Sequence, residues 1–194
     1  MIYIVRHGET QYNIEKRVQG WAQNPLNENG VTQAKKVAEK IAKLPIEHFY
    51  SSDLKRARQT AEIINEKLNL KIIYDERLRE FRSYEEMTGD LKDNLPSDFA
   101  VNPHKYNAES LRDVFKRVKQ FLDELKAKRL DNVLIVCHGA CMAVIDYMLN
   151  NPDKTANDIP DNRIGGSIPN LRLAENTGIF EYELYQEGVT HYTP

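Results

Sequence analysis

The sequence lacks the features that mark secreted, disulfide-bonded or membrane proteins. Only two cysteines occur among 194 residues, which excludes a disulfide framework and favours a reducing, cytoplasmic setting. No segment approaches the roughly 18 apolar residues that a helix needs to cross a bilayer. The apolar run at the amino terminus is too short for a signal peptide and lacks a small-residue cleavage site. We therefore expect a protein that folds in water and does not bind membranes.

A strong charge of one sign is also missing. The 27 Lys and Arg residues against 29 Asp and Glu residues give a net charge of -2, which creates no broad basic field to attract nucleic acid. Any anion site must therefore be local. Hydrophobic residues make up 41% of the chain, enough for a substantial core. No repeat or linker divides the sequence, so we expect a single domain over residues 1–194 with a lid-like excursion around residues 75–109.

Short apolar runs alternate with segments of helical periodicity. This pattern is typical of an α/β fold built from crossover units on a mostly parallel sheet. Strands are predicted at residues 2–5, 48–52, 71–74, 132–137, 171–174 and 178–185. Helices are predicted over about 28–43, 54–68, 111–125 and 140–149. Between residues 75 and 107 the periodicity breaks down, which predicts a long excursion over the sheet, and loops of this length are often functional.

Capping residues support the predicted starts of three helices. Asn27 and Asp53 each stand directly before a helical pattern. Ser110 and Asp113 have the spacing of a capping box, with Asp in the usual Glu position. These polar side chains are therefore expected to accept hydrogen bonds from the first turns of their helices.

The most informative feature is a pair of similar strand ends. The segments IYIVRHG and VLIVCHG, ending at Gly8 and Gly139, each consist of an apolar strand followed by His-Gly. Five histidines and nine glycines in this length would produce about 0.2 such dipeptides by chance. In a parallel sheet, ligands bind beyond the carboxyl ends of the strands, so His7 and His138 would face one another if their strands are neighbours.

Positive side chains accompany these histidines. Arg6 precedes His7 and supplies a planar cation that can grip an oxyanion through two hydrogen bonds. Arg56 lies in the first turn of a predicted helix, where the helix dipole also favours an anion. The combination points to phosphate binding. The alternative is that each histidine merely ends a strand and satisfies a neighbouring carbonyl; Lys55 and Arg58 are interpreted as ordinary surface charges.

Several motifs together resemble the histidine phosphatase superfamily, also called phosphoglycerate mutase-like, over nearly the whole chain. The similarity is carried by VRHGET with Asn13, by RVQG at 17–20, PLNENG at 25–30 and SSDLKRARQTA at 51–61, and by LRE at 78–80, ESLRDVFKRV at 109–118, VCHGACM at 136–142 and ENTGIFEYEL at 175–184. The resemblance implies a three-layer α/β sandwich, with helices on both faces of a mostly parallel sheet and one antiparallel strand near an edge. It points to the compact phosphatase branch of this superfamily.

Roles for individual residues follow from the resemblance. His7 would be the nucleophile that becomes phosphorylated, Glu80 the general acid, and Arg6, Arg56 and His138 would surround the phosphoryl oxygens. Substrate contacts are expected from Asn13, Gln19, Gly20 and Gly139. No metal and no cofactor is expected. The expected activity is hydrolysis of a small phosphorylated metabolite through a phosphohistidine intermediate.

The sequence also departs from the family pattern. Gln23 stands where an Asp is common, and FRSYEEMTG follows Glu80 where many members have a glycine and an aromatic residue. The wall of the pocket is therefore not defined by the resemblance; its candidates are Phe81, Arg82, Tyr84, Phe99, His104 and Tyr106. Alternatives to Glu80 as the acid are Glu76, Glu85 and Glu86.

Three other functions stay open at this stage. A phosphoglycerate mutase would use the same phosphate cage, with a second substrate hydroxyl in place of water; members of that kind are typically longer. A non-catalytic binder of phosphorylated ligands could keep the fold. A metal-dependent hydrolase is disfavoured because Cys137, His138 and Cys141 supply at most three ligands in one segment. The sequence does not indicate an oligomeric state.

Overall fold

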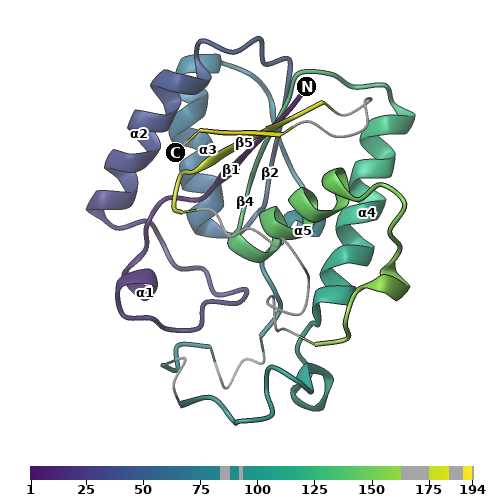
Figure 1. Ribbon diagram of the computed structural model, residues 1–194. Coiled ribbons are helices and arrows are strands. Elements are labelled where there is room, and N and C mark those ends of the chain that lie inside the picture. Colours follow the sequence, from purple (N-terminus) through teal and green to yellow (C-terminus); the bar gives the residue numbers. More distant parts are fainter. Residues whose placement is uncertain (84–87, 92–93, 163–174, 184–189, 194) are drawn as a thin grey trace.

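A central sheet organises the molecule (Figure 1). The computed structural model describes residues 1–83, 88–91, 94–162, 175–183 and 190–193. The strands are β1 (Ile2–Arg6), β2 (His48–Ser51), β3 (Ile72–Tyr74), β4 (Val133–Cys137), β5 (Ile179–Tyr182) and β6 (Thr190–Thr193). Their order in the sheet is β3-β2-β4-β1-β5-β6. The first four of these are mutually parallel and β5 runs antiparallel to both of its neighbours, which confirms the mostly parallel sheet.

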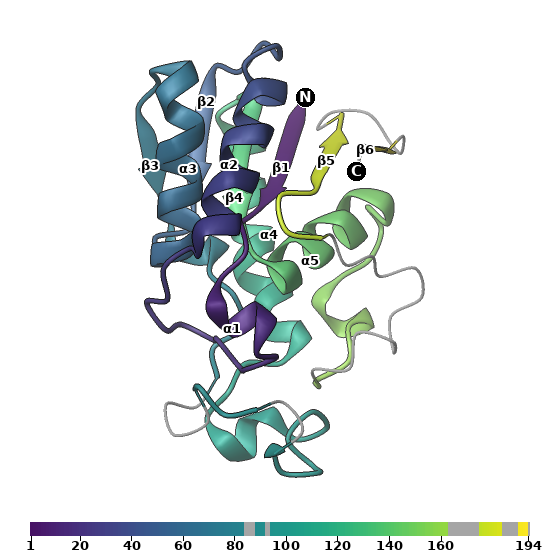
Figure 2. The same ribbon diagram turned by 90° about the vertical axis from the view of Figure 1, so that its left-hand side faces the viewer.

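Helices cover both faces of the sheet, as predicted. They are α1 (Gln11–Ile14), α2 (Glu28–Ile41), α3 (Lys55–Leu68), α4 (Leu111–Ala127) and α5 (Gly139–Asn150), with short 3₁₀ helices η1 (Glu76–Leu78), η4 (Pro103–Tyr106) and η5 (Ala156–Asp158). Figure 2 shows α2 and α3 on one side of the sheet and α4 and α5 on the other. None of the described helices combines the length and the apolar character required to span a bilayer.

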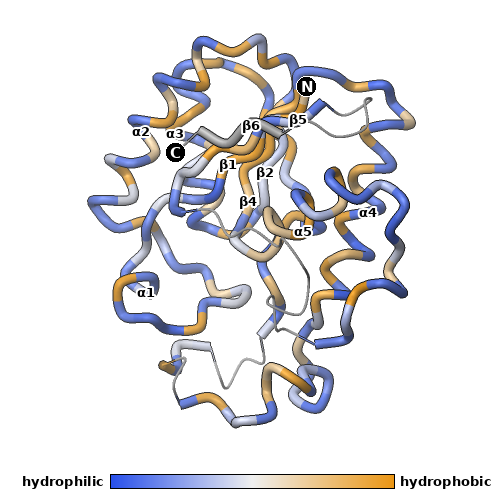
Figure 3. Tube along the Cα trace, in the orientation of Figure 1, coloured by the Kyte–Doolittle hydropathy of each residue, from blue (hydrophilic) through white to orange (hydrophobic). Residues whose placement is uncertain are grey.

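Strand alternation builds one apolar core on each face. Ile2 and Ile4 point into the core under α4 and α5, whereas Tyr3 and Val5 point into the core under α2 and α3. Figure 3 shows that the trace is strongly apolar through β1 and β4. Because β1 and β4 are covered on both sides, they read as continuous apolar runs in the sequence.

Two of the three predicted helix caps are confirmed. Asn27 accepts a hydrogen bond from the Gly30 amide at 2.7 Å, and Ser110 forms the predicted capping box with Asp113. The prediction for Asp53 is wrong: Leu54 occupies the cap position of α3 without a side-chain hydrogen bond. The Asp53 carboxylate instead accepts a hydrogen bond from Arg79 Nε at 2.7 Å, because a guanidinium provides two parallel donors that an amide cannot match.

The excursion after β3 lies beyond the carboxyl edge of the sheet rather than over its face (Figures 1 and 2). In its described part, Phe99 and Tyr106 pack against each other with ring centroids 5.6 Å apart. Phe81 packs against the core beneath α4 and α5. These aromatic side chains therefore contribute to packing. Tyr84, Glu85, Glu86 and the predicted strand at 171–174 lie outside the described residues.

Candidate active site

The two His-Gly segments meet because their strands are neighbours. Arg6 at the end of β1 pairs with Cys137 at the end of β4, so the next residues, His7 and His138, leave the sheet side by side. Their ring centroids are 5.1 Å apart. His7 is 2% exposed and His138 is fully buried. The expected meeting of the two imidazoles at the carboxyl edge is confirmed.

Hydrogen bonds define the tautomer of His7. Its Nδ1 lies 2.7 Å from the Gly8 carbonyl oxygen, which can only accept, so Nδ1 carries the proton. Nε2 is then the atom with the lone pair, and it accepts a hydrogen bond from Arg56 Nε at 3.2 Å. The backbone here is held by Thr60 Oγ1, which accepts from the Gly8 amide, and by Asn176 Nδ2, which donates to the His7 carbonyl. Nε2 is thus fixed in direction.

Gly8 owes its place to close packing. A Cβ atom at this position would lie 2.5 Å from the carbonyl oxygen of Gly30 at the start of α2. The glycine therefore lets α2 approach the loop after β1.

Arg56 is buried completely and bonds to three groups at once. Besides His7, its guanidinium donates to the carbonyl oxygens of Ala22 at 3.1 Å and Gly20 at 3.0 Å. Burial lowers the pKa of Arg56 to about 10, an effect that nearby Glu80 opposes, so the group stays charged at neutral pH. The loop at residues 20–22 thereby aims a buried cation at the His7 ring.

Burial is also the main reason that both imidazoles are held neutral. Desolvation, followed by the charges of Arg56 and Arg6, lowers the pKa of His7 well below its ordinary value. The pKa of His138 is lowered in the same direction by burial and then by Arg56. Positive charge at this density attracts an anion, and a bound anion would oppose the lowering of both pKa values by stabilising the protonated rings.

Acid should destabilise the fold because these two rings are kept neutral. Below pH about 6.5 the unfolded chain binds protons at both histidines that the folded chain does not, so stability is lost as the pH falls. Each ring should remove about 1.4 kcal/mol from the free energy of unfolding between about pH 7.5 and about pH 5.5, and the pair about 2.7 kcal/mol. Urea unfolding in phosphate-free buffer measures this difference.

The control for this prediction is a histidine outside the site. His48, at the start of β2, is partly exposed, and His48→Gln should retain the full pH dependence. A double variant, His7→Gln with His138→Gln, should lose most of it. A double variant with the original pH dependence would show that the acid sensitivity arises elsewhere.

The two ring nitrogens of His138 have different surroundings. Its Nε2 lies 2.8 Å from Ser52 Oγ, whereas its buried Nδ1 has no hydrogen-bond partner among the described residues. A buried polar atom without a partner costs free energy unless a ligand or water satisfies it. Ser52 follows β2, the other neighbour of β4, and sequence reasoning missed it because a serine after a strand carries no distinctive signal.

Glu80 also lies at the strand ends, close to His138. Its carboxylate accepts hydrogen bonds from the Ala140 amide, at 3.2 Å to Oε1 and 3.4 Å to Oε2, at the amino end of α5. It therefore lies next to His138 and Gly139. Glu76, one of the alternatives, points away: it is exposed and forms an ion pair with Arg79. Of these two carboxylates, only Glu80 is brought to the strand ends.

The four residues expected to contact substrate differ in their surroundings; they are Asn13, Gln19, Gly20 and Gly139. Asn13 Oδ1 accepts from the Thr10 amide and hydroxyl, both at 3.0 Å, so the side-chain amide nitrogen is the atom left to face a ligand. Gln19 Oε1 lies 3.0 Å from the same Thr10 hydroxyl oxygen and shares its single donor with Asn13. Gly20 has φ +46°, and a Cβ there would collide with Ser83 Oγ at 1.8 Å. In Gly139, by contrast, a Cβ would make ordinary contact with Arg6 at 3.6 Å.

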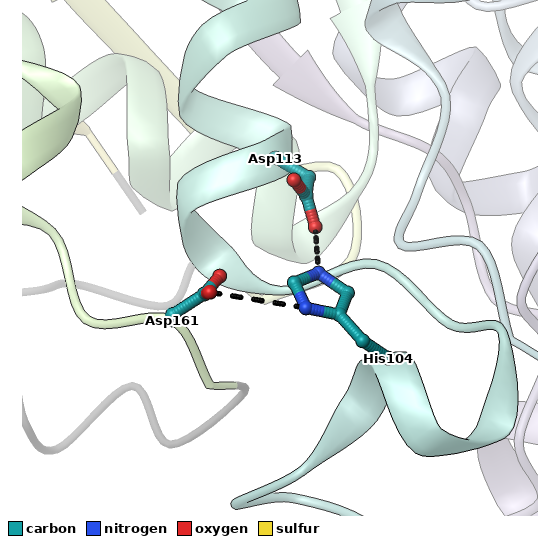
Figure 4. A group of neighbouring side chains, drawn as sticks. All are labelled: His104, Asp113 and Asp161. Carbon is teal, nitrogen blue, oxygen red and sulfur yellow. Dashed lines mark hydrogen bonds and ion pairs between the residues drawn. The ribbon is translucent and has the colours of Figure 1, made fainter.

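Within the part of the chain that the structure describes, one cluster has the side chains to hold a metal ion (Figure 4). His104 contacts Asp113 through Nε2 at 2.6 Å and Asp161 through Nδ1 at 3.8 Å. The Ser110 hydroxyl oxygen lies 2.8 Å from Asp113 Oδ2 and 2.7 Å from Asp161 Oδ1, so the two carboxylates share its single donor. The cluster acts as a cross-link between η4, the start of α4 and the loop after η5. Burial raises the pKa of Cys137, so this side chain offers no ready thiolate for a metal.

Comparison with known proteins gives a consistent picture. The family model described as the histidine phosphatase superfamily, branch 1, matches residues 2–164. A probable phosphoglycerate mutase from Escherichia coli is 35% identical over 155 residues, which are 74% of this chain and 72% of that protein.

Solved structures share the fold. A mycobacterial glucosyl-3-phosphoglycerate phosphatase in complex with VO3 is 28% identical, with a TM-score of 0.76 over 92% of this chain and 90% of that one. A phosphoserine phosphatase mutant from Entamoeba histolytica, at 23% identity, shares the fold with a TM-score of 0.73 over 100% of this chain and 94% of that one. With its paired strand-end histidines and the match over residues 2–164, the chain belongs to the histidine phosphatase superfamily.

Proposed function

We propose that this histidine phosphatase hydrolyses a small phosphorylated metabolite through a phosphohistidine on His7. The observation that carries the proposal is the meeting of three groups at the carboxyl edge of the sheet: the oriented, neutral ring of His7, the guanidinium of Arg56 that bonds to its Nε2, and the ring of His138. The His138 ring centroid lies 5.1 Å from that of His7, and its buried Nδ1 has no partner among the described residues. The likeness to a mycobacterial glucosyl-3-phosphoglycerate phosphatase supports the substrate class.

The first half-reaction transfers the phosphoryl group to the enzyme. The Nε2 lone pair of His7 attacks phosphorus, the bond from phosphorus to the ester oxygen breaks, and the Glu80 carboxyl gives its proton to the departing oxygen. Arg56 then donates to a phosphoryl oxygen in place of Nε2. Arg6 and His138 bind the other oxygens, so these side chains stabilise the charge of the transition state.

The second half-reaction regenerates the enzyme. The Glu80 carboxylate removes a proton from water as the water attacks phosphorus, the bond between phosphorus and Nε2 breaks, and His7 is released as the neutral ring. His138 donates through Nδ1 in either protonation state, because Ser52 Oγ can donate to or accept from its Nε2.

A mutase is the second candidate, favoured by the similarity to the probable phosphoglycerate mutase. The two activities differ in whether water or a substrate hydroxyl takes the phosphoryl group from His7. Incubation with 3-phosphoglycerate and with p-nitrophenyl phosphate separates them. We expect release of inorganic phosphate from a phosphomonoester; isomerisation of phosphoglycerate without net phosphate release would identify a mutase instead.

The cellular setting and the domain organisation belong to the same proposal. Both cysteines are buried free thiols, which suits a reducing cytoplasm. Residues 1–194 act as one domain because the catalytic groups come from β1, α3, β4 and the segment after η1, which are far apart in sequence.

A further inference from the structure

The backbone at Glu80 is held by donors from two distant elements. Arg117, on α4, donates from Nη2 to the Glu80 carbonyl oxygen at 3.0 Å and from Nη1 to the Arg77 carbonyl oxygen at 2.7 Å. Trp21 donates from Nε1 to the same Glu80 oxygen at 2.8 Å. The carbonyl of the residue that carries the catalytic carboxyl is therefore fixed from both sides.

Glu109 holds Arg117 in this position. Its carboxylate accepts from Arg117 Nε at 3.0 Å and from Nη2 at 3.1 Å, and the two side chains are only 14% and 13% exposed. A planar guanidinium can donate in several directions at once, whereas the ammonium group of a lysine is a compact point donor. Arg117 uses this property to join Glu109, Arg77 and Glu80. We call Trp21, Glu109 and Arg117 the Glu80 clamp.

The clamp also joins the two ends of the excursion, at Arg82 and Glu109. The Glu109 amide donates to the Arg82 carbonyl oxygen at 3.0 Å, and the Arg82 amide donates to the Glu109 carboxylate at 2.7 Å. The chain therefore leaves and returns at adjacent points. Farther out, the His104 cross-link attaches the excursion to α4 and Asp161 (Figure 4). The bonds between Arg82 and Glu109 therefore hold the chain two residues after Glu80, where the excursion begins.

We propose that Arg117, held by Glu109 and assisted by Trp21, is a positioning residue that sets the Glu80 carboxyl for proton transfer to the leaving group. The inference rests on the proposed function, in which Glu80 is the proton donor. Arg117 reaches the Glu80 carbonyl and not its carboxylate, so it acts through the backbone. A displacement of the backbone moves the carboxyl away from the amide of Ala140 and from the ester oxygen, and proton transfer is sensitive to such displacements.

The test compares two substrates that differ in their need for a proton. An alkyl phosphate such as glycerol phosphate releases a strongly basic alkoxide, whereas p-nitrophenyl phosphate releases a stable phenolate. Arg117→Lys keeps the positive charge but cannot bridge three groups. We expect kcat/KM to fall about 100-fold for the alkyl phosphate and less than about 5-fold for p-nitrophenyl phosphate. A purely structural or electrostatic role would affect both substrates equally.

Two further variants make the result specific. Trp21→Phe removes one donor to the Glu80 carbonyl oxygen and retains an aromatic ring. Like Arg117→Lys, it should lower kcat/KM more for the alkyl phosphate than for p-nitrophenyl phosphate, but by a smaller factor. It also provides the test if Arg117→Lys does not fold. Lys116→Gln, at an exposed position on the same helix, is the matched control and should change neither value.

Glu80→Gln separates this inference from the proposed function. This variant should lose far more kcat/KM for the alkyl phosphate than for p-nitrophenyl phosphate. The double variant Glu80→Gln with Arg117→Lys should have nearly the same kcat/KM values as Glu80→Gln alone. If Glu80→Gln shows no such dependence, the role of Glu80 in the proposed function is wrong. Suppose instead that Glu80→Gln shows this dependence on the leaving group. If Arg117→Lys then lowers kcat/KM equally for both substrates, or for neither, the positioning role of Arg117 is overturned.

Discussion

His7→Ala is expected to lower kcat/KM for a phosphomonoester by at least about 10⁴-fold, because the variant has no ring nitrogen to form the covalent intermediate. The fold should persist, since the side chain is held by two hydrogen bonds and packs at the end of β1 and not within a core. Labelled phosphate should be recovered on the wild-type protein after rapid quenching in alkali, where a phosphorus–nitrogen bond survives, and not on the variant.

The matched substitution is His48→Ala, which removes a partly exposed histidine from β2 and should leave turnover and labelling unchanged. Loss of labelling in both variants would point to general damage. Retention of label or of turnover in His7→Ala would show that another group attacks phosphorus, and the mechanism proposed here would be wrong.

Arg56→Lys should cause the second-largest loss, about 10³-fold in kcat/KM. A lysine keeps one positive charge but not the fork that bonds to His7, Gly20 and Ala22 together. The carbonyl oxygens of Gly20, which is buried, and Ala22, which is partly buried, would compete for its donors, so we also expect the free energy of unfolding to fall by about 3 kcal/mol. Steady-state kinetics and urea unfolding measure the two effects separately.

Arg58→Lys is the control for this change, two residues along α3. Arg58 lies on the surface, 3.9 Å from Glu62 and over the ring of Tyr74. Exposed pairs of this kind contribute about 0–1 kcal/mol, so the variant should keep its activity. Full activity in Arg56→Lys at conditions where it is folded would mean that the guanidinium geometry is unimportant for phosphoryl transfer.

The strand-end histidines and the sheet could be predicted because their signals are local. Apolar runs mark β1 and β4, and the rule that parallel strands share a carboxyl edge places His7 and His138 on one side. The Asn27 and Ser110 caps were predictable for the same reason, since donor and acceptor are three residues apart. Asp53 was mispredicted because the better partner, Arg79, is 26 residues away.

The parts of the site that could not be predicted depend on contacts between distant residues. Nothing near Ser52 indicates that it will meet His138, which is 86 positions later. Glu109 and Arg117 stand out in the sequence only as part of a family motif, and their attachment to the Glu80 backbone appears only when α4 packs beside η1.

The sequence alone determined the strands β1 to β5, the helices α2 to α5, the residues at the strand ends and the positive charge beside the two histidines, but it did not indicate α1 or β6. Only the tertiary structure decided that β1 and β4 are neighbours, that His7 is left with Nε2 as its reactive nitrogen, and that a guanidinium from α4 holds Glu80 in place. The physical reason is that periodicity and capping act over a few residues, whereas burial and hydrogen bonding across the folded chain set the direction, the tautomer and the charge of each catalytic group.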